Sequence, residues 1–288
     1  MKKNNIDENI EIKEKINFLN NEIERKKGIS YKKINLNNLF IYLNIIIIYC
    51  ILFKYNEKNN NDINTIKFNN QKNITLADYI FSGIPKKYQI IVNKYRRKWI
   101  HWPIPNEIIF KPLMSKKDLI AFCFFMKQEN IYFEFGSGGS TNIASIYKLK
   151  TYSVESDKNW HENLKRNGIL ANYITIDLKG NSFGYPGNNT NITDWKKYIQ
   201  SYKKEYNADI ILIDGRFRVA CALDIYSKIR DDTLILIHDY VSRKQYNIIE
   251  KFYIKLKIWD SLALFIKNTQ ANPIKEEEYN RYLINKYL

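Results

Sequence analysis

The chain has 288 residues, 45% of them hydrophobic, which is enough to bury one sizeable core in a single main domain with appendages. Its formal net charge of +16 favours anionic partners, but the lysines are spread through an Asn-rich chain, so nucleic-acid binding is not indicated. The cysteines Cys50, Cys123 and Cys221 lie far apart, with no CxxC pair and no His at zinc spacing. They indicate neither a disulfide framework nor a structural zinc site.

The first 75 residues have the features of a tail, a membrane anchor and a linker. Residues 1–38 are polar, whereas residues 39–53, LFIYLNIIIIYCILF, are uncharged and almost wholly apolar. This run is shorter than the roughly 20 residues that cross a bilayer core, but Asn38 and a snorkelling Lys54 extend it. We expect a single transmembrane signal anchor over 39–54, and a buried core helix or a signal peptide is the alternative.

The charges that flank residues 39–53 predict an orientation. More basic residues precede this run than follow it, which places the N-terminus in the cytoplasm and the domain across the membrane. Without an anchor the protein would be cytoplasmic. Residues 55–75, rich in Asn and Lys, are predicted to be a linker.

Residues 76–288 are predicted to form one domain with its core at about 110–267. Ser115 opens a capping-box pattern before the helix LIAFCFFMK, and strands then alternate with helices. The predicted strands are 131–135, 151–155, 173–177, 209–214 and 233–238, with two further candidates around Ile258 and at 262–266. Helical patterns follow at 140–147, 157–167, 217–229 and 244–252. These patterns predict an α/β domain with a doubly wound, mostly parallel sheet, in which ligands bind beyond the carboxyl ends of the strands.

The stretch YFEFGSGGST places three glycines where the first strand meets a helix. Gly136, Gly138 and Gly139 let a ligand approach the main chain, and the helix start offers free N–H groups. A P-loop needs a Gly-Lys pair, which is absent, and a dinucleotide-binding GxGxxG needs a third glycine where this chain has Thr141. Glu134 precedes the loop, where a carboxylate repels a pyrophosphate but can receive an ammonium group. Glu155 ends the second strand and is placed to hydrogen-bond both ribose hydroxyls.

These residues suit a ligand with adenosine at one end and an amino acid at the other. At EFGSGGST and the downstream VES, the chain resembles class I S-adenosylmethionine-dependent methyltransferases over about residues 110–267. EFGSGGST, SVESDKNW, IDGRFRVACAL and LIHDY in this order resemble a bacterial-type branch, and a looser similarity reaches the membrane-anchored glucuronoxylan methyltransferases of plants. The resemblance implies a Rossmann-like fold and S-adenosylmethionine as cofactor. It also implies the cofactor-binding residues Glu134, Gly136, Ser137, Gly138, Gly139, Ser140 and Glu155.

The acceptor side is predicted at the ends of the fourth and fifth strands, where Asp214, His238 and Asp239 stand. His238 is the candidate base, oriented by Asp214 or Asp239. Alternatively Asp214 and Asp239 hold a divalent metal ion that lowers the pKa of the acceptor hydroxyl, as in the catechol O-methyltransferase-like branch that these positions resemble. Arg216 and Arg218 stand at a helix start, where cations oppose the helix dipole, so they are candidates for binding an acidic sugar or a phosphate.

Residues 178–206 form a longer insert, which is either a lid or a surface loop. The sequence as a whole predicts a methyltransferase that acts on the oxygen of a small-molecule or glycan acceptor, attached to a membrane through residues 39–53. An NAD(P)-dependent oxidoreductase and a non-catalytic nucleotide-binding module are the alternatives.

Overall fold

The structure is a computed structural model that describes residues 65–66, 74–96, 104–105, 108–180 and 184–283. The chain divides into two compact units, Met1–Asp62 and Ile63–Leu288, and the described residues belong to the second. The predicted tail, the predicted anchor over 39–54 and most of the predicted linker therefore lie outside the described residues. Among the helices that are described, none combines the length and the apolar character that a membrane crossing needs.

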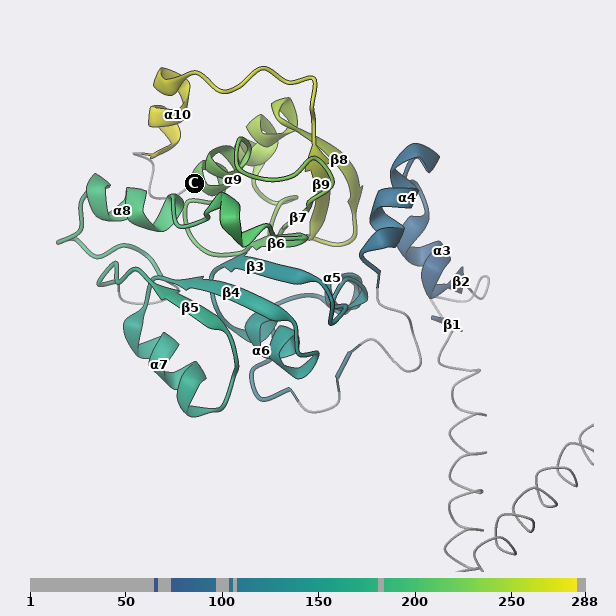
Figure 1. The fold of residues 1–288 in the computed structure, drawn as a ribbon, viewed down its shortest axis with the longest axis horizontal. Helices are drawn as coiled ribbons and strands as arrows, with labels where there is room; N and C mark the ends of the chain where they lie inside the picture. Colours follow the sequence, from purple (N-terminus) through teal and green to yellow (C-terminus); the bar gives the residue numbers. More distant parts are fainter. Residues whose placement is uncertain (1–64, 67–73, 97–103, 106–107, 181–183, 284–288) are drawn as a thin grey trace, which may run out of the picture. The chain divides into compact units, whose positions relative to one another are not determined.

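A seven-stranded sheet forms the centre of the described residues, in the order β5-β4-β3-β6-β7-β9-β8 (Figure 1). Its strands are β3 (Ile131–Phe135), β4 (Lys150–Glu155), β5 (Asn172–Thr175), β6 (Ile210–Ile213), β7 (Leu234–Ile237), β8 (Tyr253–Ile258) and β9 (Ala263–Lys267). Strands β5, β4, β3, β6 and β7 run parallel, and β9 runs antiparallel to both of its neighbours. The predicted mostly parallel, doubly wound sheet is confirmed, with its topological switch point between β3 and β6.

Helices cover both faces of this sheet because its central strands are apolar on both sides. One face carries α3 (Leu76–Phe81), α4 (Lys86–Lys94), α5 (Lys116–Phe124) and α6 (Gly139–Ile146). The other carries α8 (Ile192–Ile199), α9 (Arg218–Ile225), the 3-10 segment η2 (Lys244–Lys251) and α10 (Glu276–Leu283). In β6, Ile210 and Leu212 pack into the first layer and Ile211 and Ile213 into the second. Helix α7 (Lys158–Arg166) packs against β4 and β5, and a short 3-10 turn, η1 (Lys204–Tyr206), precedes β6.

Local signals place most boundaries within a few residues of the predicted ones. The Ser115 hydroxyl accepts a hydrogen bond from the Asp118 amide at 3.1 Å, so it caps α5 as expected. Residues 244–251 form a 3-10 segment, where a helix over 244–252 was predicted. Within the predicted linker, β1 (Thr65–Ile66) and β2 (Ile74–Thr75) pair antiparallel.

Candidate active site

A cavity of about 820 Å³ opens beyond the carboxyl ends of the central strands, at the switch point of the sheet. The predicted residues that line it are Gly136, Ser137, Gly138, Gly139, Ser140, Glu155, Asp214, Arg216, Arg218, His238 and Asp239. The fold thus brings the predicted cofactor loop and the predicted acceptor residues to one space. Glu134 is absent from this lining.

The glycine loop packs backbone against backbone on two sides. Gly136 has φ +96°, and a Cβ there would lie 2.8 Å from the main chain of Gly215 at the end of β6. A Cβ on Gly139 would lie 2.2 Å from the nitrogen of Pro112. A Cβ on Gly138 would meet nothing within 4 Å, so the space beside it is open. Gly136 and Gly139 are therefore required by packing as well as by any ligand.

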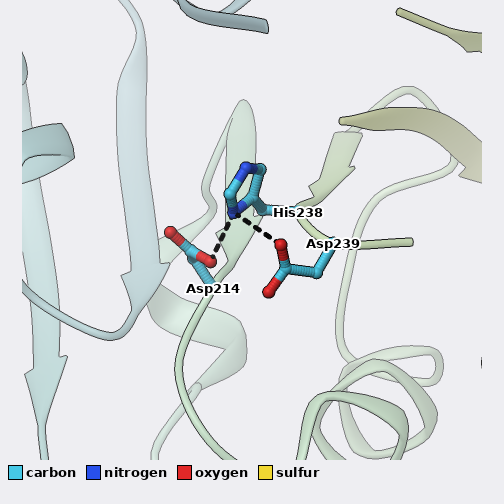
Figure 2. A group of neighbouring side chains, drawn as sticks. All are labelled: Asp214, His238 and Asp239. Atoms are coloured by element: carbon cyan, nitrogen blue, oxygen red, sulfur yellow. Dashed lines mark hydrogen bonds and ion pairs between the residues drawn. The ribbon is translucent and has the colours of Figure 1, made fainter. Parts of the chain in front are cut away.

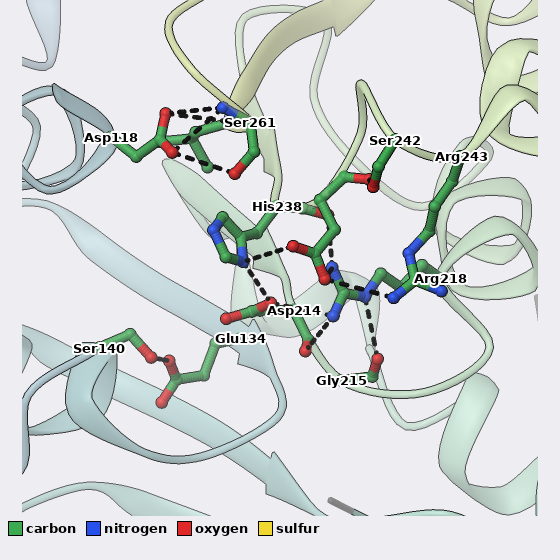
Figure 3. Close-up of polar contacts among 12 residues, drawn as sticks. Asp118, Glu134, Ser140, Asp214, Gly215, Arg218, His238, Ser242, Arg243 and Ser261 are labelled. Carbon is green, nitrogen blue, oxygen red and sulfur yellow. Dashed lines mark hydrogen bonds and ion pairs between the residues drawn. The ribbon is translucent and has the colours of Figure 1, made fainter. Parts of the chain in front are cut away.

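Glu134 lies beneath the loop instead of facing the cavity. Its carboxylate is fully buried and accepts hydrogen bonds from the hydroxyls of Tyr132 at 2.7 Å, Ser140 at 2.6 Å, Ser153 at 2.7 Å, and from Thr141 (Figure 3 shows the Ser140 contact). This placement differs from the expectation that Glu134 receives the ammonium group of the cofactor. Glu134 is the penultimate residue of β3, and side chains within a strand alternate between the two faces of the sheet, so it points under α6.

These hydroxyl contacts tie Glu134 to the loop that does line the cavity. Thr141 accepts a hydrogen bond from the Gly138 amide at 2.7 Å and donates its own proton to Glu134. The hydroxyls of Ser137 and Ser153 lie 2.5 Å apart. Burial raises the pKa of Glu134, and the four hydroxyl donors oppose that shift. The buried carboxyl group therefore fixes the conformation of the loop.

Glu155 is the last residue of β4, and its carboxylate reaches the cavity. It accepts hydrogen bonds from the backbone amides of Ser137 at 3.0 Å, Ser156 at 2.6 Å and Asp157 at 2.9 Å. Burial raises the pKa of Glu155 to about 7, although these amides oppose the shift. The group is thus close to half ionised at neutral pH before any ligand binds.

His238 follows β7 and points its Nδ1 at two carboxylates (Figure 2). Nδ1 lies 3.0 Å from Asp214 Oδ1 and 3.7 Å from Asp239 Oδ1. Burial by itself lowers the pKa of His238, but the hydrogen bond and charge of Asp214, with the charge of Asp239, outweigh it, so the pKa is raised. A carboxylate on Nδ1 leaves Nε2 as the nitrogen that can accept a proton.

Arg218 joins these two strand ends from the first turn of α9 (Figure 3). Its guanidinium is buried and donates to the backbone oxygens of Gly215 at 3.0 Å, Asp214 at 3.0 Å and His238. It also forms ion pairs with the carboxylates of Asp214 at 3.1 Å and Asp239 at 3.3 Å. All three of its nitrogens are therefore engaged within the protein, which differs from the expectation that Arg218 binds substrate. Arg218 positions Asp214 and Asp239 instead.

The same carboxylates offer a candidate metal site. One ligand atom each from Asp214, His238 and Asp239 lies within 4.8 Å of the others, and two carboxylates with an imidazole fit a divalent cation by donor type. Arg218 reduces the negative charge of this cluster, and an ion on Nδ1 would replace the hydrogen bond between His238 and Asp214. The residues therefore fit a weakly held ion.

Several wall residues were not identified by the sequence analysis. Residues 109–113 line the cavity beside Gly139, together with Trp160 and with Gly184 and Tyr198 of the insert. Phe110 packs edge-on against Trp160 at 5.2 Å between ring centroids, and the indole of Trp160 donates to the Ser137 carbonyl at 2.9 Å. Trp160 lies within the SVESDKNW motif, so the sequence did contain a signal that could have identified it as a wall residue. The segment 109–113 carries no motif that would have identified it in the sequence. It reaches the cavity because it packs against the start of α6.

Comparison with solved structures finds a methyltransferase-like protein from Silicibacter pomeroyi that is 25% identical, with a TM-score of 0.53 over 62% of this chain and 98% of that protein. A TehB-like S-adenosylmethionine-dependent methyltransferase from Corynebacterium glutamicum matches at 13% identity and a TM-score of 0.33, over 50% of this chain and 83% of its own. MycE, a methyltransferase of mycinamycin biosynthesis in complex with Mg, SAH and mycinamycin VI, matches at 14% identity and a TM-score of 0.31, over 55% of this chain and 49% of its own.

No protein-family model and no curated protein matches the chain. The similarity to the Silicibacter pomeroyi protein extends over nearly all of that protein. The described part of this chain has the Rossmann-like fold of methyltransferases.

Proposed function

We propose that this protein is an S-adenosylmethionine-dependent methyltransferase that transfers the methyl group to a hydroxyl oxygen. The observation that carries this proposal is the cavity itself. It combines the glycine loop after β3, the Glu155 carboxylate at the end of β4, and the pair of Asp214 and His238 at the ends of β6 and β7. The fold around it is that of methyltransferases.

The cofactor half of the cavity is built by the loop and by Glu155. The loop from Gly136 to Ser140 offers main-chain groups and hydroxyls to the amino-acid part, and Glu155 accepts from the ribose hydroxyls. S-adenosylmethionine supplies a methyl group that is activated by the positive sulfonium. Once the methyl group has been transferred, the sulfur remains on the cofactor product as a thioether. Thr141 stands where a dinucleotide site has its third glycine, and its side chain is buried against Glu134, which disfavours a nicotinamide cofactor.

The acceptor half is built by Asp214, His238 and Asp239. Asp214 holds the proton on Nδ1 of His238, so that Nε2 takes the proton of the acceptor hydroxyl as the oxygen attacks. Arg218 keeps both carboxylates in place and limits their repulsion. If a divalent cation binds, Asp214, His238 and Asp239 hold it, and it lowers the pKa of the acceptor hydroxyl.

The test is a screen of glycans, phenols and lipids with cofactor labelled on its methyl group, with and without added divalent cations. Calorimetry with S-adenosylhomocysteine on the same full-length protein measures cofactor binding separately from transfer. We expect S-adenosylhomocysteine to bind and label to appear on a hydroxyl compound. Binding of NAD(P)H in place of S-adenosylhomocysteine would refute the proposal in favour of an oxidoreductase.

A further inference from the structure

The carboxylates that line the cavity are already matched by donors or cations within the protein. Asp214 and Asp239 pair with Arg218, and Asp239 also lies 3.4 Å from Nη2 of Arg243. Glu155 accepts from three backbone amides. Asp157 caps α7 by accepting from the amides of its first turn. The negative charge of the cavity is therefore largely satisfied before a ligand enters.

The guanidinium of Arg216 has no ion-pair partner of this kind among the described residues. It lines the cavity half-buried, and among the described residues no carboxylate forms an ion pair with it. Its Nε is buried without a hydrogen-bond partner in the described part of the chain. The guanidinium carbon lies over the Tyr185 ring at 3.9 Å from its centroid, a cation–π contact that holds the side chain while its N–H groups can still bind a ligand. Arg218, only two residues away, uses all of its nitrogens within the protein.

A second cation lines the same cavity. Lys111 lines the cavity, is exposed, and has no ion pair to a described carboxylate. Arg216 directly follows Gly215, whose main chain touches Gly136, so its guanidinium belongs to the same space as the glycine loop and His238. Arg216 and Lys111 are therefore the lining cations that form no ion pair with a described carboxylate.

We infer that Arg216, held over the Tyr185 ring, is a binding site for an anionic group of the methyl acceptor, with Lys111 as a weaker second contact. This inference rests on the proposed function and narrows its substrate class. The acceptor carries a carboxylate or a phosphate in addition to the hydroxyl that is methylated. A guanidinium binds either group through two parallel hydrogen bonds, which also orients the acceptor toward His238.

The experiment uses the full-length chain saturated with S-adenosylhomocysteine, into which matched compounds are titrated and followed by ligand-observed NMR. The sets are catechol with dihydroxybenzoate, and glucose with glucuronate and glucose phosphate, so that carboxylate and phosphate are distinguished. We expect the wild type to bind an anionic member more tightly than its neutral counterpart, and Arg216→Met to lose about tenfold to a hundredfold of that affinity. Arg216→Lys should recover part of it, and Lys111→Met should lose less.

Arg166→Met is the matched control, because it removes one arginine charge from the exposed side of α7. The anion preference should persist in this control. Two results would overturn the inference: no preference for anionic members in the wild type, or an undiminished preference in Arg216→Met. A loss of S-adenosylhomocysteine affinity in Arg216→Met would assign the residue to the cofactor instead. Failure of the wild type to bind S-adenosylhomocysteine would refute the proposed function itself.

Discussion

Two glutamates near neighbouring strand ends have different environments. Glu155 is the final residue of β4 and reaches the cavity, whereas Glu134 is one residue short of the end of β3 and points under α6. The sequence pattern placed both at the cofactor. The parallel register pairs Glu134 with Ser153, so Glu155 lies two positions nearer the carboxyl edge of the sheet on the same face. There it accepts from the Ser137 amide, whereas hydroxyls of α6 enclose Glu134.

Glu155 should make cofactor binding depend on pH. Its pKa of about 7 in the empty cavity means that the group is increasingly protonated below neutrality. Ribose hydroxyls donate to the ionised form, so binding lowers this pKa and releases a proton. Affinity for S-adenosylhomocysteine should therefore fall below pH 7, by up to about tenfold per pH unit. Calorimetry between pH 6 and 8 measures this, and Glu155→Gln should bind weakly with no such dependence; an unchanged profile in the variant contradicts the assignment.

His238 should control turnover but not cofactor binding. Its protonated form cannot accept a proton, so the rate with an acceptor from the screen should rise with pH through the pKa of His238, which Asp214 and Asp239 raise above its ordinary value. His238→Gln should lower kcat by about a hundredfold to ten-thousandfold. S-adenosylhomocysteine affinity should stay within about twofold of the wild type, because the cofactor half of the cavity is unchanged. Equal loss of rate and affinity would assign His238 to cofactor binding.

At the scale of elements, the start of α6 and the segment 109–113 make one wall. Gly139 begins α6 and touches the main chain of Lys111 and Pro112, and the Phe110 amide donates to the Asn142 side chain at 3.0 Å. A helix start that carried any side chain at residue 139 would push this segment away. The close approach therefore decides where the wall of the cavity lies.

This contact predicts a difference between two adjacent glycines. Gly139→Ala places a methyl group 2.2 Å from the nitrogen of Pro112, so the segment must shift and S-adenosylhomocysteine affinity should fall by about tenfold or more. Gly138→Ala has open space around its Cβ in the empty cavity, so it leaves the segment in place and serves as the control for folding, measured by thermal unfolding. Titration of Gly139→Ala against the wild type measures the loss of affinity. Unchanged affinity in Gly139→Ala would show that the segment does not shape the cofactor half.

At the scale of the whole described domain, Asp118 connects the start of α5 to the turn between β8 and β9. Its fully buried carboxylate accepts from the backbone amides of Asp260, Ser261 and Leu262, and from the Ser261 hydroxyl at 3.0 Å. These partners lie more than 140 residues away along the chain. The edge of the sheet is thus held to the helical layer beside the end of β7, where the Tyr240 amide donates to the Ser261 carbonyl at 2.9 Å.

Removing this connection should reduce stability without affecting the cofactor site. Asp118→Ala leaves buried donors unsatisfied and should lower the free energy of unfolding by about 2–4 kcal/mol. Asp260 lies in the same turn and forms a solvent-exposed ion pair with Lys117 of α5. Asp260→Ala removes this pair, so it should change the free energy of unfolding by less than about 1 kcal/mol. Denaturant unfolding of both variants measures the difference, and S-adenosylhomocysteine affinity should be retained. Similar free energies of unfolding for Asp118→Ala and Asp260→Ala would mean that water replaces the lost carboxylate of Asp118.

The sequence by itself determined the alternation of strands and helices, the position of the glycine loop and the strand-end residues Asp214, His238 and Asp239. These depend on local periodicity and on the rule that ligands bind at the carboxyl edge of a parallel sheet. The anchor predicted over 39–54 stays a prediction, because it lies outside the described residues.

Only the tertiary structure decided which glutamate faces the cavity, which arginine is already paired, and which distant segment forms the wall. Arg216 and Arg218 are alike in the sequence, yet one lies over the ring of Tyr185 in the insert and the other is enclosed by two strand ends. The physical reason is that a side chain's partners depend on packing between residues far apart in the chain. A local sequence pattern carries no information on such packing.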